Sequence, residues 1–119
     1  MRSEYIFSLQ REIGLRGFFG GESEWLPPTD VYETAEEFVV LMELPGLERE
    51  EIKISFTEGV LTIRGERREK NRGSPVHYHQ MEIRYGPFQR EIYFPVSLAK
   101  EGIKAQYRQG LLRVALPKR

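Results

Sequence analysis

The chain contains no cysteine among its 119 residues. This absence excludes a disulfide scaffold, a thiol nucleophile and a zinc site built on thiolates, and it suits a reducing cytoplasm, where we expect the protein to work. An excess of charge of one sign is also missing, because 18 Lys and Arg residues balance 18 Asp and Glu residues. A neutral chain creates no overall field to attract nucleic acid or an anionic membrane, and it lacks charge repulsion against self-association.

Long apolar and long helical segments are absent as well. No apolar run approaches the roughly 18 residues that a membrane span needs, so we expect no membrane contact. The first residues lack the apolar core and cleavage site of a secretory signal. Beyond residue 24, no helical pattern extends over about 12 residues or more.

Short runs of alternating apolar and polar residues, separated by turn residues, occupy most of the chain. The runs that we predict as strands are residues 29–33, 38–44, 52–56, 60–64, 88–95, 103–108 and 111–116, with 77–84 as a further short candidate. Glu58-Gly59 and Gln109-Gly110 are predicted hairpin turns, because glycine accepts a positive φ. The pattern predicts an all-β protein, an immunoglobulin-like antiparallel β-sandwich of about seven strands.

Residues 1–26 differ from the rest and are predicted to form a short flexible N-terminal arm before a domain of residues 27–119. Ile6, Leu9 and Ile13 have the spacing of one helix face, and the glycines that follow break any helix. A helix this short is marginal in water, so we expect a mobile, sticky arm that orders on contact. The alternative is that these residues simply pack on the domain.

One arginine is predicted to point inward. Phe88, Arg90, Ile92 and Phe94 share one parity and therefore one face of their strand. If the apolar side chains face the core, Arg90 does too, and an arginine there is costly unless it is paired. Two interpretations stay open, an ion pair within one chain and a pair formed across a dimer.

Four segments, in the same order, resemble signatures of the α-crystallin domain of small heat-shock proteins. They are residues 28–33, Leu44-Pro45-Gly46, residues 78–95 with Tyr85-Gly86 at their centre, and the closing hairpin of residues 105–118. The resemblance covers residues 27–118, most of the chain. It implies an ATP-independent holdase chaperone, not an enzyme, which binds partly unfolded client proteins without a cofactor.

The resemblance also implies a homodimer, with higher oligomers open. In bacterial, archaeal and plant members the segment matching residues 77–84 crosses to the partner and adds a strand to its sheet, and the arginine matching Arg90 lies at the interface. Applied here, the dimer interface would contain Tyr78, His79, Met81, Ile83 and Arg90. We predict Glu82 as the carboxylate that pairs with Arg90, the alternative being that Glu82 merely faces solvent.

Some positions depart from the family pattern. An arginine often stands where this chain has Ile83, and another where it has Gln80, so the dimer contacts are expected to differ in detail. The I-x-I tail that usually follows Pro117-Lys118 in the family does not occur in this sequence. Two interpretations stay open, a tail that was removed and a member that lacks one. We therefore expect the dimer to form, whereas the case for large cage-like oligomers is weaker.

Two apolar surfaces are predicted to bind clients. The first is the arm, through Ile6, Phe7, Leu9, Ile13, Phe18 and Phe19, which a flexible segment can adapt to many shapes. The second is a groove beside the edge strand that carries Ile52, Ile54 and Phe56, which receives the tail in the family and is expected to stay open here. Plain core packing of these three residues is the alternative, because parity alone does not distinguish the two faces of the strand.

Other kinds of chemistry have little support. His77 and His79 point to one side of a strand, but no third metal ligand is implied, so we predict no metal site. The charged run of residues 65–76 mixes both signs and is expected to be a solvated loop, not a nucleic-acid patch. No phosphate-binding or catalytic motif is present. A CS-domain co-chaperone and an interaction module with one folded partner remain the alternatives, and a hydrolase is the least favoured.

Overall fold

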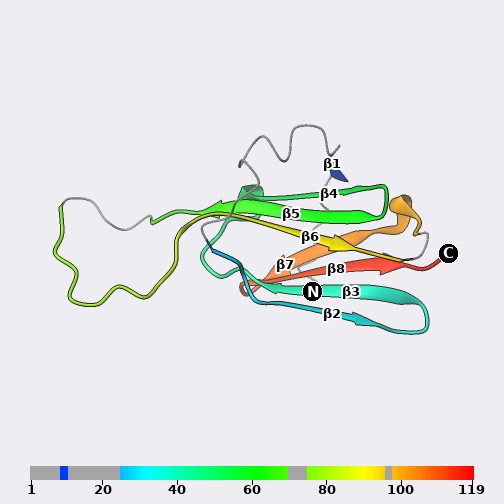
Figure 1. Ribbon diagram of the computed structural model, residues 1–119, viewed down its shortest axis with the longest axis horizontal. Helices are drawn as coiled ribbons and strands as arrows, with labels where there is room; N and C mark the ends of the chain where they lie inside the picture. Colours follow the sequence, from blue (N-terminus) through cyan, green and yellow to red (C-terminus); the bar gives the residue numbers. More distant parts are fainter. Residues whose placement is uncertain (1–8, 11–24, 70–74, 96–97) are drawn as a thin grey trace.

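The seven predicted strands all form, each with a boundary within three residues of the predicted one (Figure 1). The computed structural model describes residues 9–10, 25–69, 75–95 and 98–119. Its strands are β1 (Leu9–Gln10), β2 (Thr29–Glu33), β3 (Glu37–Glu43), β4 (Ile52–Thr57), β5 (Val60–Arg67), β6 (Gly86–Tyr93), β7 (Lys104–Arg108) and β8 (Leu111–Pro117). Two short 3-10 turns, η1 (Arg49–Glu51) and η2 (Lys100–Gly102), precede β4 and β7.

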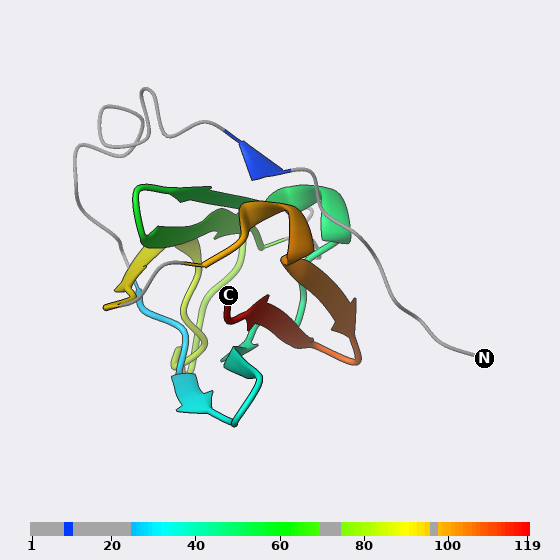
Figure 2. The ribbon, with the colours of Figure 1, turned by 90° about the vertical axis from the view of Figure 1, so that its right-hand side faces the viewer.

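The strands form two sheets that lie face to face (Figures 1 and 2). One sheet has the order β1-β4-β5-β6 and the other β2-β3-β8-β7. All pairings except β1 with β4 are antiparallel. The arrangement is the predicted all-β sandwich, with β1 and β6 at the edges of one sheet and β2 and β7 at the edges of the other.

Two tight turns create the predicted hairpins. Glu58 and Gly59 have φ of 53° and 81°, and Gln109 and Gly110 have φ of 53° and 79°. Positive φ at both central residues matches the right-handed twist of the paired strands, which is why such turns prefer glycine. The turns fix the register of β4 on β5 and of β7 on β8.

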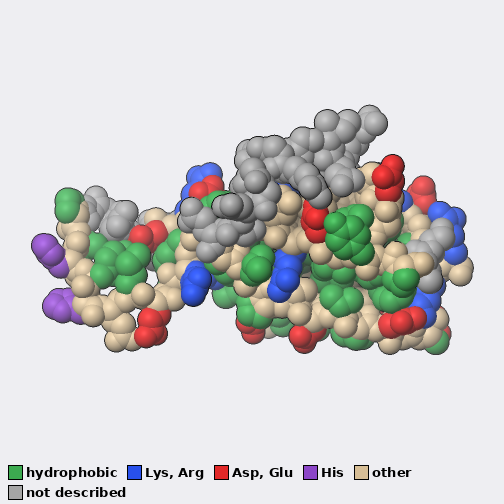
Figure 3. Space-filling view, viewed as in Figure 1, with side chains coloured by type: hydrophobic (Ala, Val, Ile, Leu, Met, Phe, Trp, Pro, Cys, Tyr) green, Lys and Arg blue, Asp and Glu red, His purple; other side chains and the backbone are tan. Residues whose placement is uncertain are grey.

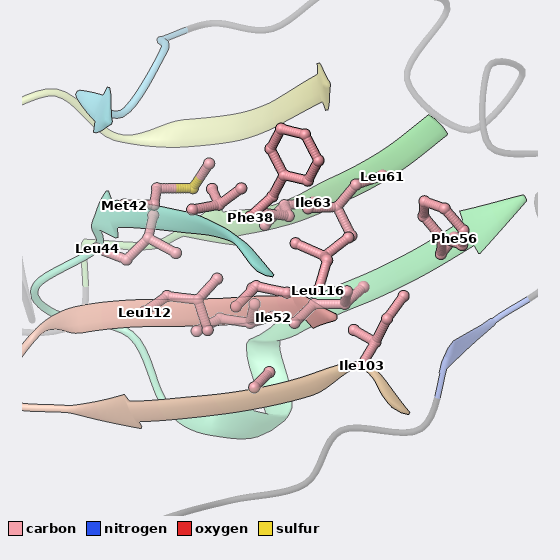
Figure 4. Packing of buried hydrophobic residues seen from close by; sticks show 14 of the residues in the cluster. Phe38, Met42, Leu44, Ile52, Phe56, Leu61, Ile63, Ile103, Leu112 and Leu116 are labelled. Carbon is pink, nitrogen blue, oxygen red and sulfur yellow. The ribbon is translucent and has the colours of Figure 1, made fainter. Parts of the chain in front are cut away.

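The core lies between the sheets and is built from the residues of one parity on each strand (Figure 4). On the first sheet, Ile54 faces Ile63 across β4 and β5, and on the second Val40 faces Val114 across β3 and β8. Each fully buried aliphatic side chain of this kind contributes roughly 1.5 to 3 kcal/mol. Burial of these alternate positions therefore selects the register, since a slip of one residue would turn them outward.

Two expectations about local structure were not met. The short helix that the spacing of the arm predicts is not found at Leu9–Gln10. These two residues form a strand that pairs in parallel with Ile54 and Ser55 of β4. A short helix gains little in water, whereas the β4 edge offers unpaired backbone groups to any adjacent segment. Residues 77–84 form no strand in the single chain, because they lie beside no sheet edge that could accept their hydrogen bonds.

Within the described ranges, no helix has the length and apolar character required to cross a lipid bilayer.

Candidate functional site

The connection between β5 and β6, residues 68–85, extends beyond the end of the sandwich (Figure 1). We call it the long loop. Its described part is exposed from Pro75 to Arg84, and Met81 and Ile83 keep 64% and 65% of their surface accessible. Figure 3 shows apolar side chains gathered on it, with histidine side chains at its far end. Exposed apolar groups on an extended segment indicate a surface that another chain covers.

The β2 edge offers the second half of a contact surface. Strand β2 pairs with β3 along one side only, so the backbone groups of its other side have no strand beside them in the described chain. Val31 lies opposite the core residue Val40, yet it keeps 47% of its surface exposed. Tyr32, on the other face of β2, is exposed as well. An open edge with apolar side chains is a template for an added strand.

Arg90 lies on the inner face of its sheet, as its parity predicted. It faces Ile63 of β5 and stands two residues from the fully buried Phe88. Its Nη2 donates a hydrogen bond of 3.5 Å to the carbonyl of Pro27, just before β2. Its Nε is buried and makes no hydrogen bond. A guanidinium with an unsatisfied buried donor costs stability until an acceptor reaches it.

Glu82 does not supply that acceptor within one chain. It is exposed on the long loop, and no ion pair joins any carboxylate in the described ranges to Arg90. Pairing of Glu82 with Arg90 across a dimer stays a prediction. Tyr78, on the same loop, donates a hydrogen bond to Glu69, and His79 is exposed.

The predicted groove residues Ile52, Ile54 and Phe56 are buried members of the core cluster, with exposures of 2%, 1% and 6%. This is the position that the core-packing alternative expected for them. The backbone edge of β4 is paired with β1, so it is not an open edge at Ile54 and Ser55. Of the arm residues, Leu9 belongs to β1, and the others lie outside the described residues: Ile6, Phe7, Ile13, Phe18 and Phe19.

Two groups missed in the sequence lie at the base of the long loop. The guanidinium of Arg67, the last residue of β5, lies 4.0 Å from the centre of the Trp25 ring. It donates to the carbonyls of Arg84 and Pro45, and the Trp25 indole donates to the carbonyl of Gly86 at 2.9 Å. We call this arrangement the Arg67–Trp25 clasp. Neither residue stands in an informative pattern, and the proximity arises only from the tertiary fold.

A pocket of about 700 Å³ lies beside the clasp. Its lining combines Trp25, Ile83 and Tyr85 with side chains of both charges, including Arg68 and Glu82. Such a mixed lining selects neither anions nor cations. Across the described residues, no group of three or more His, Cys, Asp or Glu side chains is arranged to hold a metal ion.

Burial changes the pKa of two groups in the sandwich. Tyr107 of β7 donates from its hydroxyl to the carbonyl of Leu44, and the carbonyl of Leu47 lies 3.1 Å away. Loss of solvent raises the pKa of this hydroxyl above its ordinary value, since the phenolate is poorly solvated there. Burial likewise lowers the pKa of Arg64 on the outer face of β5. Burial is the largest cause of both shifts, so we assign them to packing within the sandwich.

A two-sheet sandwich with a long loop between β5 and β6 and an inward arginine on β6 defines the α-crystallin type of domain. The match to known proteins agrees with this class: the Hsp20/alpha crystallin family matches residues 30–119, and the chain belongs to this family.

Named relatives come from bacteria, plants and fungi. The chain is 35% identical over 98 residues to the small heat shock protein C2 of Rickettsia felis, covering 82% of this chain and 64% of that protein. It is 35% identical over 116 residues to a 17.8 kDa class I heat shock protein of Solanum lycopersicum, covering 95% of this chain and 75% of the relative. The chain thus spans less than two thirds of the Rickettsia protein.

Solved structures of the same kind superpose well. Heat shock protein 16.0 from Schizosaccharomyces pombe aligns with a TM-score of 0.75 and 35% identity, covering 80% of this chain and 88% of that one. A small heat-shock protein from Xylella fastidiosa, described as having a distinct high order structure, aligns with a TM-score of 0.74 and 34% identity, covering 81% and 88%.

Proposed function

We propose that this protein is an ATP-independent holdase chaperone that binds partly unfolded proteins and keeps them from aggregating. The observation that carries the proposal is the family match over residues 30–119, which contain the sandwich apart from β1 and the first residue of β2. Unfolding clients expose apolar surface and strand edges, and a holdase must offer apolar surface in return. We assign client binding to the arm, residues 1–26, and assembly to the domain, residues 27–119.

The assembly that we propose is a homodimer formed by strand exchange. Residues 77–84 of each chain would add to the β2 edge of the other, covering Met81, Ile83 and Val31 together. Three features of the single chain support this: the exposed apolar loop, the open β2 edge and the buried, unsatisfied Nε of Arg90. A carboxylate or carbonyl brought by the partner would satisfy that donor.

The test is light scattering from a heat-labile client protein, heated with and without this protein in the absence of ATP. We expect suppression of scattering near a one-to-one ratio of chains. A variant without residues 1–24 should stay folded and lose most of the protection, since the sandwich lacks the adaptable apolar side chains of the arm. Trp25 remains in that variant, so its fluorescence verifies the fold.

No suppression by the folded full chain would contradict the holdase proposal. Saturable binding to one folded protein, without activity on heated clients, would favour an interaction module. Full protection by the shortened variant would move the client site to the sandwich.

A further inference from the structure

One side chain at the base of the long loop bonds back to the loop's far end. The loop leaves the sandwich after Arg67, and the guanidinium of Arg67 turns back to its far end, donating from Nε to the carbonyl of Arg84 at 2.9 Å and from Nη2 to the same oxygen. Its third donor, Nη1, reaches the carbonyl of Pro45 at 3.2 Å, in the turn after β3. One planar group therefore joins the loop's start, its end and the opposite sheet.

Trp25 completes the clasp from a fourth segment. Its ring lies under the guanidinium at 4.0 Å, and its indole N–H holds the carbonyl of Gly86, the first residue of β6. The same ring also packs edge-on against Phe88, with ring centres 5.4 Å apart. Trp25 is 8% exposed, so the stacking is largely shielded from water, where such a contact is stronger.

Closing a loop at its base reduces the conformations that its tip can explore. A segment that must order when it binds a partner loses affinity by the cost of that ordering, and a constraint in the free chain lowers the cost. Apart from the clasp, the loop is exposed over residues 75–84. The β5–β6 pairing, which ends with Arg67 opposite Gly86, closes the loop at its base, and Tyr78 donates to Glu69 further out. The clasp adds the contacts that hold the loop's far end, at Arg84, to Trp25 and to the turn at Pro45.

We propose that Arg67, stacked on Trp25, is the positioning residue that presents the long loop for strand exchange and so sets the affinity of the dimer. This rests on the proposed homodimer and adds to it a determinant outside the exchanged segment. Arg67 itself need not touch the partner chain. Because Trp25 directly precedes the sandwich, the same group also fixes where the arm leaves the domain.

Lysine cannot replace arginine here. The guanidinium donates to two carbonyls in different segments while its flat face covers an aromatic ring, whereas an ammonium is a point donor without a planar face. Arg67→Lys keeps the charge and most of the aliphatic stem, so it removes the clasp geometry with little other change. Arg113→Lys is the matched control, because Arg113 on β8 is partly exposed and pairs with Glu37 at 3.7 Å, away from the loop.

The experiment measures the dimer dissociation constant by sedimentation equilibrium, together with melting temperature and tryptophan fluorescence. Trp25 is the only tryptophan in the chain, so the emission reports on the surroundings of this one ring. We expect Arg67→Lys and Arg67→Ala to raise the dissociation constant roughly tenfold or more, the size of one or two lost charged hydrogen bonds. Their emission should shift to the red, and Arg113→Lys should match the wild type.

Each result bears on the proposal. If Arg67→Ala does not fold, the dimer dissociation constant of Arg67→Lys alone tests the proposal. Wild-type dimer affinity in both folded variants would overturn the positioning role and leave the proposed function intact. Equal weakening by Arg113→Lys would also overturn it, because the effect would then be general. A wild-type chain that stays monomeric at all concentrations would overturn both the exchanged dimer and the clasp's role in it.

Discussion

The hydroxyl of Tyr107, on β7, holds the segment that runs from β3 to β4. Its hydrogen bond to Leu44 fixes the turn that follows β3 to strand β7, although the two residues are far apart in sequence. Tyr107→Phe removes the donor and leaves the carbonyls of Leu44 and Leu47 without it. We therefore expect the free energy of unfolding to fall by roughly 1 to 3 kcal/mol. Denaturant titration at neutral pH measures the loss, and Tyr93→Phe, on an exposed side chain, is the control.

The raised pKa of Tyr107 gives that prediction a pH dependence. The hydroxyl must be protonated to donate, so its stabilisation is complete below the ordinary tyrosine pKa of about 10 and is lost as pH rises through the higher folded-state pKa. The wild type should therefore lose stability more steeply than Tyr107→Phe above roughly pH 10. Parallel curves for the two proteins would contradict the role of the hydroxyl.

Strand β5 depends on one glycine for its fit between its neighbours. A Cβ at Gly65 would lie 2.5 Å from the carbonyl oxygen of Glu51 and 2.9 Å from the ring of Phe88. Neither can yield easily, because one is backbone and the other is fully buried. Gly65→Ala is expected to destabilise the sandwich by about 3 kcal/mol or more, at the upper end of overpacking.

The control for that substitution is Gly102→Ala, where the added Cβ would meet the Pro117 side chain at 3.1 Å. A thermal melt of the two variants compares them directly, and similar losses would show that Gly65 is not under special constraint.

At the scale of the strands, the sequence predicts where strands form but not which segments pair along the sheet edges. Alternation predicted seven strands and the inward face of Arg90, because burial on one face imposes a period of two. It did not predict β1, where a two-residue pairing with β4 depends on tertiary proximity and not on local preference. It also did not predict the Arg67–Trp25 clasp, since the four segments that form it are brought together only by the fold.

At the scale of the whole molecule, the proposed exchanged dimer predicts that substitutions of apolar loop residues change the oligomeric state more than the stability of the folded chain. Ile83→Gln should shift the protein toward monomers while leaving the melting behaviour of the sandwich intact at high dilution, because Ile83 is 65% exposed in the single chain. Leu111→Gln is the matched control, an exposed leucine on β8. Light scattering after size-exclusion chromatography reports the mass, and an unchanged dimer in Ile83→Gln would argue against strand exchange.

Strands β5 and β6 are antiparallel neighbours that a turn of a few residues would connect, yet residues 68–85 separate them. Closing so long a loop costs about 1 kcal/mol more entropy than closing a short one. In a single chain no sheet pairing of the loop's described residues compensates for this entropy loss. Shortening the connection to an Asn-Gly turn should therefore produce a more stable sandwich that stays monomeric. In the proposed exchanged dimer, this entropic cost is offset when residues 77–84 of each chain pair with the β2 edge of the other.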